Sequence, residues 1–390
     1  MSQGLHGVRV LDLTRYMLGG FPTQLFADLG AEVIKIEAMP QGDFCRAEEP
    51  LRNGVSHYFT ALCRNKKSLT LNLKSAQGLD IFRHLLAASD VVIENFRPGV
   101  TRKLGIDYEM ARAVNPRIVY CSMSGFGQDD PLSLAALHDV NLQAMSGFTD
   151  LNEGRLPPLS LCDIATGMGA AQGIALALFQ RERTGAGQHV DVPMFDSLVW
   201  WMSVVYSRYH FQGGNISPQT LEYPSLSYTI FPTRDGKYLS FGMIEEKFWR
   251  YFCTQTGNED LIPLQKRHPQ EEPAAYERLR RLVASKTRDE WQAWLAGKDM
   301  CIYPAKTAAE AIEDLVAKGS GLVAYAEFPG VGKVLQTNVP IRFSEMPHDL
   351  ADATAPPRLG EHSAEVLRKL GYSDDDVREL IRAGVTSSPD

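Results

Sequence analysis

The sequence lacks the motifs by which nucleotide-binding and metal-binding proteins are most readily identified. It contains no G-x-G-x-x-G and no G-x-x-x-x-G-K-[ST], so neither a dinucleotide-binding fingerprint nor a P-loop is present. The six cysteines are scattered, without a C-x-x-C pair or a cluster with histidines, which gives no indication of a metal site or a disulfide framework. We therefore expect buried, reduced thiols in a cytoplasmic protein.

Positive charge and long apolar runs are also scarce. The formal net charge is −7 at pH 7, which makes the chain a poor polyanion binder, and we expect no nucleic-acid partner. No basic N-terminal region precedes an apolar core and no apolar run looks long enough to cross a bilayer, so we expect no membrane partner. The 390 residues exceed what one hydrophobic core usually supports, which predicts two domains.

Short apolar runs alternate with longer amphipathic ones in the first half of the chain. We expect helices over 22–30 and 76–89, and strands over 8–13, 31–37, 68–74, 90–96 and 117–127. This alternation predicts an α/β fold whose parallel sheet is covered on both faces. Ligands of such sheets bind at the carboxyl ends of the strands, so the segments after residues 13, 74, 96 and 127 are of interest.

The second half of the chain has a different sequence pattern. A helix rich in small residues is expected over 164–183 and an aromatic helix over 194–211, followed by a linker over 213–224. A hairpin with Asp235–Gly236 as its turn comes next, and helical segments run to about 318. The tail carries two short helices that we expect to return to the first domain.

Basic residues gather near two of the expected strand ends. They are Lys66, Lys67, Lys74, Arg97, Arg102 and Lys103. In an acidic protein this grouping suggests a small ligand that carries phosphate. A solvated cationic face explains the same residues equally well.

Three residues are candidates for acid–base chemistry. His138 follows a loop that borders the binding edge of the sheet, although a lone histidine is more often structural. Asp163 stands where a strand-like run enters a helix and could be either catalytic or a helix cap. Glu245 also precedes a helix and could merely complement its dipole. No spacing rule links the three, so only the fold could bring them together.

Many longer motifs occur together and in order. They are "LHGVRVLDLT", "TQLFADLGAEVIKIE", "NKKSLTLNLKS", "DVVIENFRPGV", "NPRIVYCSMSGFGQ", "RTGAGQHVDVPM" and "RLGEHSAEVL". With them the chain resembles the family III CoA-transferase superfamily of the CaiB/BaiF type. The resemblance implies a large Rossmann-like parallel-sheet domain from residues 1–212 and 320–390 and a smaller inserted α+β domain from 225–318. It also implies an interlocked homodimer in which each active site forms between the large domain of one subunit and the small domain of the other.

The superfamily contains two chemistries. Transferases use an aspartate as nucleophile, and α-methylacyl-CoA racemases use the same aspartate as an acid–base group; by similarity it is Asp163 here. The segments "HDVN" and "GMIEEKF" resemble racemase motifs and imply His138 as the second catalytic group, with Glu245 orienting it. The segment "CDIATGM" resembles transferases instead. We therefore expect racemase-type 1,1-proton transfer through an enolate, with CoA transfer through an aspartyl-CoA intermediate as the alternative.

The resemblance also implies how the substrate is held. Asp139 would lie near the thioester, and the CoA portion would contact Lys74, Asn95, Phe96, Arg97 and Arg102. Ala38 stands where many members have a basic residue that binds the CoA phosphate. No metal and no permanently bound cofactor are expected, because coenzyme A arrives as part of the acyl-CoA substrate.

Overall fold

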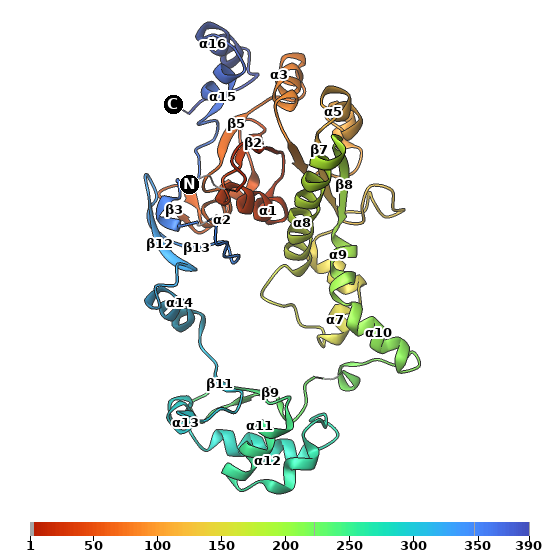
Figure 1. Cartoon of the computed structure of the whole chain (residues 1–390), viewed down its shortest axis with the longest axis vertical. Coiled ribbons are helices and arrows are strands. Elements are labelled where there is room, and N and C mark those ends of the chain that lie inside the picture. Colours follow the sequence, from red (N-terminus) through yellow and green to blue (C-terminus); the bar gives the residue numbers. More distant parts are fainter. Residues whose placement is uncertain (1–3, 222, 347, 390) are drawn as a thin grey trace. The chain divides into compact units, whose positions relative to one another are not determined.

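A computed structural model of the chain describes residues 4–221, 223–346 and 348–389. The chain divides into two compact units (Figure 1). Unit 1 comprises Met1–Thr149, Arg155–Met202 and Lys318–Asp390, and unit 2 comprises Asp150–Gly154 and Ser203–Ala317. The first large segment thus ends at Met202 rather than at residue 212, because helix α10 groups with unit 2.

Unit 1 is built on a six-stranded parallel sheet in the order β5-β2-β1-β6-β7-β8. Its strands are β1 (Arg9–Asp12), β2 (Glu32–Glu37), β5 (Lys67–Thr70), β6 (Val91–Glu94), β7 (Val119–Ser124) and β8 (Gln188–Pro193). Every residue of β6 and β7 is buried, as expected for central strands covered on both faces. The predicted α/β class with a parallel sheet is confirmed. The direction of strand succession reverses between β1 and β6, and a ligand crevice is expected there.

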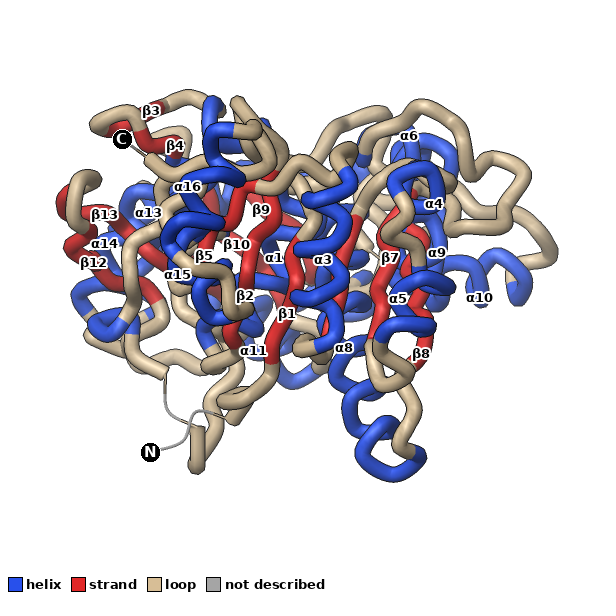
Figure 2. The backbone as a smooth tube through the Cα atoms, turned by 90° about the horizontal axis from the view of Figure 1, so that it is seen from above, coloured by secondary structure: helices blue, strands red, loops and turns tan. Residues whose placement is uncertain are grey.

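Two groups of helices cover the sheet. Helices α3 (Ala76–Ala87), α5 (Tyr108–Val114), α15 (Ser363–Lys369) and α16 (Asp374–Arg382) share one apolar core with the strands. Figure 2 shows α3 and α5 on one side of the sheet. On the other face α1 (Tyr16–Asp28) packs against α8 (Leu161–Thr184), which also contacts β7, β8 and α9 (Met194–Trp201).

Shorter elements complete unit 1. Two hairpins for which we saw no sequence signal are present, β3 with β4 and β12 with β13. The remaining elements are β3 (Leu51–Arg52), β4 (Val55–Ser56), β12 (Val323–Phe328), β13 (Gly332–Thr337), α2 (His57–Leu62), α4 (Val100–Leu104), α6 (Asp139–Met145) and the one-turn α7 (Phe148–Leu151) at the boundary of the units. The 3₁₀ helices are η1 (Phe44–Ala47) and η4 (Leu350–Asp352) here, and η2 (Pro218–Thr220) and η3 (Glu259–Leu264) in unit 2.

Unit 2 has its own core, centred on the buried Trp249 and Trp291. Its antiparallel sheet has the order β11-β10-β9. The predicted hairpin is confirmed: β9 and β10 pair from Pro232 opposite Tyr238, and Gly236 takes the positive φ of 72° that the turn requires. The elements are β9 (Tyr228–Pro232), β10 (Tyr238–Gly242), β11 (Ile302–Pro304), α10 (Ser203–Phe211), α11 (Glu246–Thr256), α12 (Pro273–Ala284), α13 (Arg288–Leu295) and α14 (Ala308–Ala317).

Two expectations about helices need correction. The aromatic run over 194–211 forms two helices rather than one: α9 ends at Trp201 and α10 begins at Ser203. The expectation that no apolar run is long enough to cross a membrane is wrong for α8, which passes that test by length and composition. However, α8 packs on α1 and on the strands of unit 1, and 44% of its apolar window is buried there. Core helices of globular proteins pass the same test, so α8 gives only weak support for a membrane span.

Candidate active site

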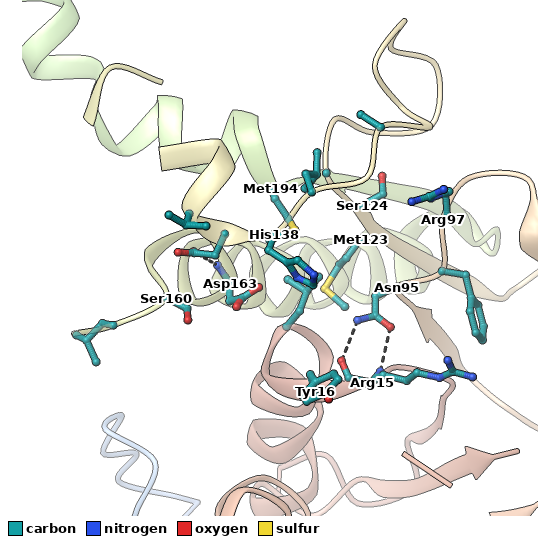
Figure 3. A pocket seen from close by; sticks show the side chains of 18 of the residues that line it. Arg15, Tyr16, Asn95, Arg97, Met123, Ser124, His138, Ser160, Asp163 and Met194 are labelled. Atoms are coloured by element: carbon teal, nitrogen blue, oxygen red, sulfur yellow. Dashed lines mark hydrogen bonds between the residues drawn. The ribbon is translucent and has the colours of Figure 1, made fainter. Parts of the chain in front are cut away.

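A cavity of about 870 Å³ opens in unit 1 at the carboxyl ends of β1, β6 and β7. The reversal of strand order predicts a crevice at this place. Both acid–base candidates that unit 1 contains, His138 and Asp163, line the cavity. Figure 3 shows the two side chains next to each other, with Arg97 across the cavity. The fold thus brings together two groups that are distant along the chain.

His138 is the residue before α6. Its backbone is extended, with φ −132° and ψ 174°, and its N–H donates to Asn141 Oδ1 at 2.9 Å. The bond closes the first turn of α6 and fixes the backbone from which the imidazole projects. His138 is exposed in unit 1 and lines the cavity.

Asp139 does not act as a simple partner of its neighbour His138. One oxygen of its carboxylate accepts the backbone N–H of Cys162 at 2.6 Å and that of Asp163 at 3.3 Å, and the other accepts the side-chain amide of Gln143. These amides are at the second and third positions of α8, where helical N–H groups have no partner within the helix. Asp139 therefore caps α8 from a neighbouring helix and fixes the backbone of Asp163.

Asp163 is the third residue of α8, whose N-terminal flanking residue is Ser160. The alternative in which Asp163 itself caps the helix is therefore replaced by capping from Asp139. Burial raises the pKa of the Asp163 carboxyl to about 6, and the negative charge of Asp139 adds to this effect. His138 and the Ser160 hydroxyl partly oppose the shift. The carboxyl group can consequently gain or lose a proton near neutral pH.

Two tyrosines that the sequence interpretation missed line the same cavity. The pKa of Tyr58 is raised to about 12, first by burial and then by the negative charge of Asp163, which lines the same cavity. Tyr16 begins α1 with a φ of 57°, a left-handed conformation that is rare for a residue with a large side chain. Its N–H donates to Asp43 and its hydroxyl to Glu48. The only sequence signal was the paired glycines that follow in "YMLGGFP".

A second cavity, of about 570 Å³, lies at the ends of β1, β2 and β5. Arg15 and Phe96 line both cavities. The Arg15 guanidinium carbon stands 4.8 Å from the centre of the Phe44 ring and 5.7 Å from that of Phe96, within the range of a cation–π contact. Asn95 binds the backbone of Arg15 twice, through its amide N–H and its carbonyl oxygen, both at 2.9 Å. Asn95 thus joins the loops after β1 and β6, and its side chain is already engaged.

The expected cations are only partly at these cavities. Lys74 lines the second cavity and Arg97 the first. Arg102 lines neither; it borders a smaller cavity, is 84% exposed and lies 3.6 Å from Asp107. The second cavity also contains Ala38, and the described cations that line it are Arg15 and Lys74.

Two of the lysines grouped with the binding edge are elsewhere. Lys66 is buried and binds Asp12 at 3.3 Å and the Thr23 hydroxyl at 2.6 Å. Lys67 begins β5, at the amino edge of the sheet, where it binds Glu32 and Glu365, each at 2.8 Å. Both lysines therefore serve the fold, and the suggestion that they bind a phosphate is wrong.

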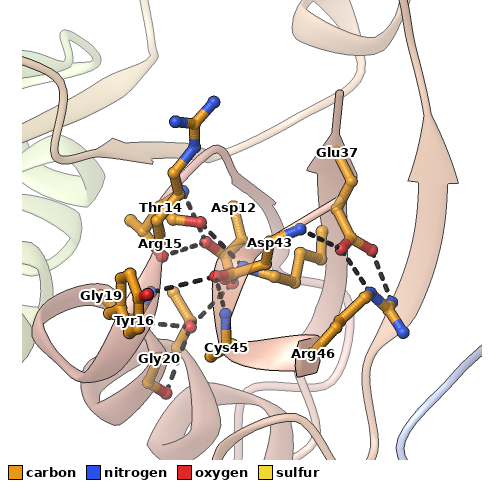
Figure 4. Close-up of polar contacts among 12 residues, drawn as sticks. Asp12, Thr14, Arg15, Tyr16, Gly19, Gly20, Glu37, Asp43, Cys45 and Arg46 are labelled. Atoms are coloured by element: carbon orange, nitrogen blue, oxygen red, sulfur yellow. Dashed lines mark hydrogen bonds and ion pairs between the residues drawn. The ribbon is translucent and has the colours of Figure 1, made fainter. Parts of the chain in front are cut away.

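A buried polar network supports the loop that enters α1 (Figure 4). The carboxylate of Asp12 accepts the Thr14 N–H at 3.0 Å, and Lys35 binds Asp43 at 2.8 Å. Asp43 in turn accepts the Tyr16 N–H. Glu37 forms a two-point pair with Arg46, both contacts at 2.7 Å. Ionised groups thus hold the strained Tyr16 backbone in place. A binding site with fixed geometry requires such supporting contacts.

Glu245 belongs to unit 2, where it is exposed and immediately precedes α11. Its charge acts on the thiol of Cys301, a residue with a φ of 52°. Its predicted contact with His138 of unit 1 stays a prediction.

No cluster of three or more potential metal ligands occurs among the residues that the structure describes. The six cysteines are free, and five of them are buried.

Comparisons with known proteins agree on the family. The model of CoA-transferase family III matches residues 5–363. The chain is 32% identical to the succinyl-CoA:glutarate CoA-transferase of Mus musculus, covering 98% of this chain and 90% of that protein. It is 31% identical to the alpha-methylacyl-CoA racemase of Mus musculus, covering 96% of each. A CaiB/BaiF family protein from Brucella suis superposes with a TM-score of 0.83 at 30% identity, covering 95% of this chain and all of that one.

These matches place the chain among enzymes that act on acyl-CoA thioesters. The chain belongs to CoA-transferase family III. Relatives of both chemistries match at almost the same identity, so the reaction has to be argued from the site itself.

Proposed function

We propose that the protein catalyses racemase-type 1,1-proton transfer at the α-carbon of a 2-methylacyl-CoA. The observation that carries this proposal is the presence of His138 and Asp163 in one cavity, with the pKa of Asp163 raised to about 6. Inversion requires that a proton leaves one face of the carbon and that another arrives on the opposite face. A carboxyl group with a raised pKa and an imidazole, on different elements around one cavity, are the kinds of groups that meet this requirement.

The chain's own residues supply each part of the reaction. Asp163 and His138 each take the proton in one direction and return it in the other. The intermediate is an enolate, whose oxygen needs hydrogen-bond donors. The Tyr58 phenol stays protonated, because its pKa is about 12, and is available as such a donor. Glu245 is proposed to orient His138 and to support its charged form.

The test is an exchange experiment. A single enantiomer of a 2-methylacyl-CoA is incubated with the protein in heavy water, and deuterium at the α-carbon is followed by mass spectrometry together with the enantiomeric ratio. We expect deuterium incorporation with racemisation, and a loss of both of about 10²-fold or more in His138→Gln and in Asp163→Asn. Transfer of CoA to an added carboxylic acid without any exchange would overturn the racemase proposal.

CoA transfer is the second candidate, and a specific observation favours it. Above pH 6 Asp163 is ionised, its backbone is fixed by Asp139, and the segment after it resembles the transferases. An ionised carboxylate held in this way can attack a thioester carbonyl and form an acyl-enzyme anhydride with release of the CoA thiolate. Hydroxylamine trapping at Asp163 would support this reaction. His138→Gln would then leave transfer largely intact.

We propose that the CoA portion of the substrate extends from the catalytic cavity into the second one. Lys74, Phe96 and Arg97 keep the roles that the resemblance implies, and Asn95 acts through the backbone of Arg15. Arg15 joins them, because it lines both cavities and Ala38 provides no cation. Arg102 is the weakest member of the set, since it borders a different cavity.

We propose further that the protein is a homodimer. Large apolar side chains are exposed on α8 and α9 of unit 1, among them Leu176, Phe179 and Trp200 at 69%, 58% and 70%. Exposed apolar groups of this size are typical of surfaces that pair with another chain. Sedimentation equilibrium tests the proposal. The free thiols fit a reducing compartment such as the cytoplasm.

A further inference from the structure

Glu94, the last residue of β6, is a buried acid that the proposed reaction does not use. Its side chain is 2% exposed, and Oε2 accepts the backbone N–H of Phe96 at 2.7 Å. Within the described residues Glu94 has no salt-bridge partner. An acid without a counter-charge is costly to bury, so its hydrogen bonds are the interactions that hold it in place.

The segment that Glu94 holds is a wall of both cavities. Phe96 lines the catalytic cavity and the second cavity, and Arg97 lines the first. Asn95 ties the same segment to the backbone of Arg15. The hydrogen bond from the Phe96 N–H to Glu94 is thus a third point of attachment, and it is the one whose acceptor can change its charge.

Ser122 and His189 lie between Glu94 and a third cavity. Ser122 is directly opposite Glu94 on β7, and its hydroxyl lowers the pKa of the carboxyl group. The same hydroxyl lies 2.9 Å from Nε2 of His189 on β8, whose ring stacks on Tyr108 at 5.1 Å. Ser122, Tyr108 and His189 line a cavity of about 310 Å³. The side chains of Ser122 and His189 therefore lie one after the other between that cavity and the buried carboxyl group.

The charges around Glu94 keep its proton affinity near neutrality. Burial raises its pKa to about 7, Asp191 of β8 adds to this, and the bonds from Ser122 and Phe96 oppose it. Tyr120 lies on the same face of β7 as Ser122 and Cys121 on the opposite face; both have raised pKa values and remain neutral. Burial lowers the pKa of His189, which favours its neutral form at the same pH. Asp107, from the helix side, acts on Tyr120.

We propose that Glu94 is a positioning residue whose proton, exchanged through Ser122 and His189, sets how firmly the Phe96–Arg97 segment is held for the CoA portion of the substrate. When Glu94 is ionised, its carboxylate accepts the Phe96 N–H in a charge-assisted bond and accepts the Ser122 hydroxyl as well. When it is protonated, its O–H donates to Ser122 and the bond from Phe96 weakens. The effect on CoA rests on the proposed binding of CoA in these cavities.

The first readout is the Kd of free CoA, measured by calorimetry between pH 5.5 and 8.5. We expect binding about tenfold weaker at the low end, since a hydrogen bond to a charged group is worth about 1.4 kcal/mol more than one to a neutral group. Because the phosphate of CoA also titrates near pH 6, wild type is compared with Glu94→Gln. This variant should bind weakly at all pH values, apart from the ligand's own titration.

Two further variants separate positioning from a purely structural role. Ser122→Ala removes a hydrogen bond that lowers the pKa of Glu94, so the midpoint of the pH dependence should move to higher pH. Glu109→Gln removes the same charge from the rim of the third cavity without touching Phe96, and it should leave the midpoint unchanged. An unchanged midpoint in Ser122→Ala overturns the proposal.

The second readout does not depend on CoA. Hydrogen exchange of the peptide that contains Phe96, corrected for intrinsic rates, should show greater protection above pH 7 in wild type and no such step in Glu94→Gln. If this change in protection is present but CoA does not bind at any pH, the proposed ligand is wrong and the positioning role of Glu94 is supported. Equal protection of wild type and Glu94→Gln at every pH overturns that role.

Discussion

Asp163 shows how burial, in the first place, and then two neighbouring residues set the pKa of one carboxyl group. Asp139 fixes its backbone and at the same time repels its negative charge, while His138 draws the pKa in the opposite direction. The outcome is a pKa of about 6 rather than the ordinary 3.8. A carboxyl group tuned in this way is ionised at neutral pH but still has appreciable proton affinity, which suits proton transfer better than an ordinary aspartate would.

This balance can be shifted by removing Asp139's charge. The rate of α-proton removal by Asp163 should rise with pH through about 6, because the carboxylate is the competent base. In Asp139→Asn the repulsion is gone, so the pKa of Asp163 falls and the midpoint should move to lower pH. The pH dependence of kcat/KM for deuterium incorporation measures this. The exposed Asp129→Asn serves as a control with an unchanged midpoint, and an upward shift in Asp139→Asn would contradict the argument.

The raised pKa of Glu94 also predicts how the free energy of unfolding depends on pH, independently of CoA binding. Its pKa is about 7 when folded and near the ordinary 4.5 when unfolded, so the folded state binds more protons between these values. The free energy of unfolding should therefore fall as pH rises through this window, by up to roughly 3 kcal/mol. Glu94→Gln avoids the cost of burying a charge and should be more stable than wild type at pH 8. Urea denaturation at pH 5 and pH 8 tests this, and a variant that is less stable at pH 8 would refute it.

At the scale of elements, the junction of β1, α1 and β5 depends on a buried ionic network. Lys66 neutralises Asp12, and both side chains are fully buried. Among the described residues, Lys66→Met leaves Asp12 with the more distant Lys35, at 4.0 Å, as its counter-charge. We expect a destabilisation of about 3–5 kcal/mol.

The adjacent lysine offers a matched control for this variant. Lys67→Met removes contacts with Glu32 and Glu365 that are partly exposed to solvent, and it should cost less than about 1 kcal/mol. Urea denaturation monitored by circular dichroism compares the two variants. Equal losses of stability would show that the buried network is not the stronger determinant.

The elements also show what the sequence could and could not predict. Strand–helix alternation located the sheet, because apolar runs and helical periodicity are local signals. The same signals did not distinguish Lys66 from Lys67, which are adjacent in one basic run. Lys66 is buried because its side chain points at Asp12, whereas that of Lys67 does not. The beginning of α1 at Tyr16, six residues before the expected helix, was missed because Asp43 and Glu48 hold it through contacts distant in sequence. Pro22 inside α1 also made the expected start misleading.

At the scale of the whole molecule, some residues of the site can be predicted from local motifs, whereas others depend on contacts between distant parts of the chain. Family motifs named Asp163 and His138, and folding of unit 1 brings them to one cavity. The sequence did not predict that Tyr58 and Arg15 line the cavity. Their positions there depend on the order of the strands in the sheet, and no local sequence pattern indicates that order. Glu245 lies in unit 2, so its role depends on how units of one or two chains assemble.

Subunit mixing decides whether Glu245 acts across a dimer. Asp163→Asn disables unit 1 and Glu245→Gln disables unit 2, and each homodimer should be nearly inactive. If each site combines unit 1 of one chain with unit 2 of the other, a mixed dimer pairs the intact unit 1 of one variant with the intact unit 2 of the other. Co-expression should then restore about a quarter of wild-type exchange activity, since half of the dimers are mixed and each has one intact site.

If both units of a site come from the same chain, every site in the mixture carries one defect and no activity returns. Asp163→Asn mixed with His138→Gln gives the control, because both changes lie in unit 1 and no arrangement of chains creates an intact site. The control mixture cannot form an intact site. If exchange activity returned equally in the test and control mixtures, it could not come from sites shared between subunits, and that outcome would contradict the shared-site arrangement. Recovery confined to the first mixture would assign Glu245 to the partner's site and explain how an exposed carboxylate of unit 2 can act on a histidine of unit 1.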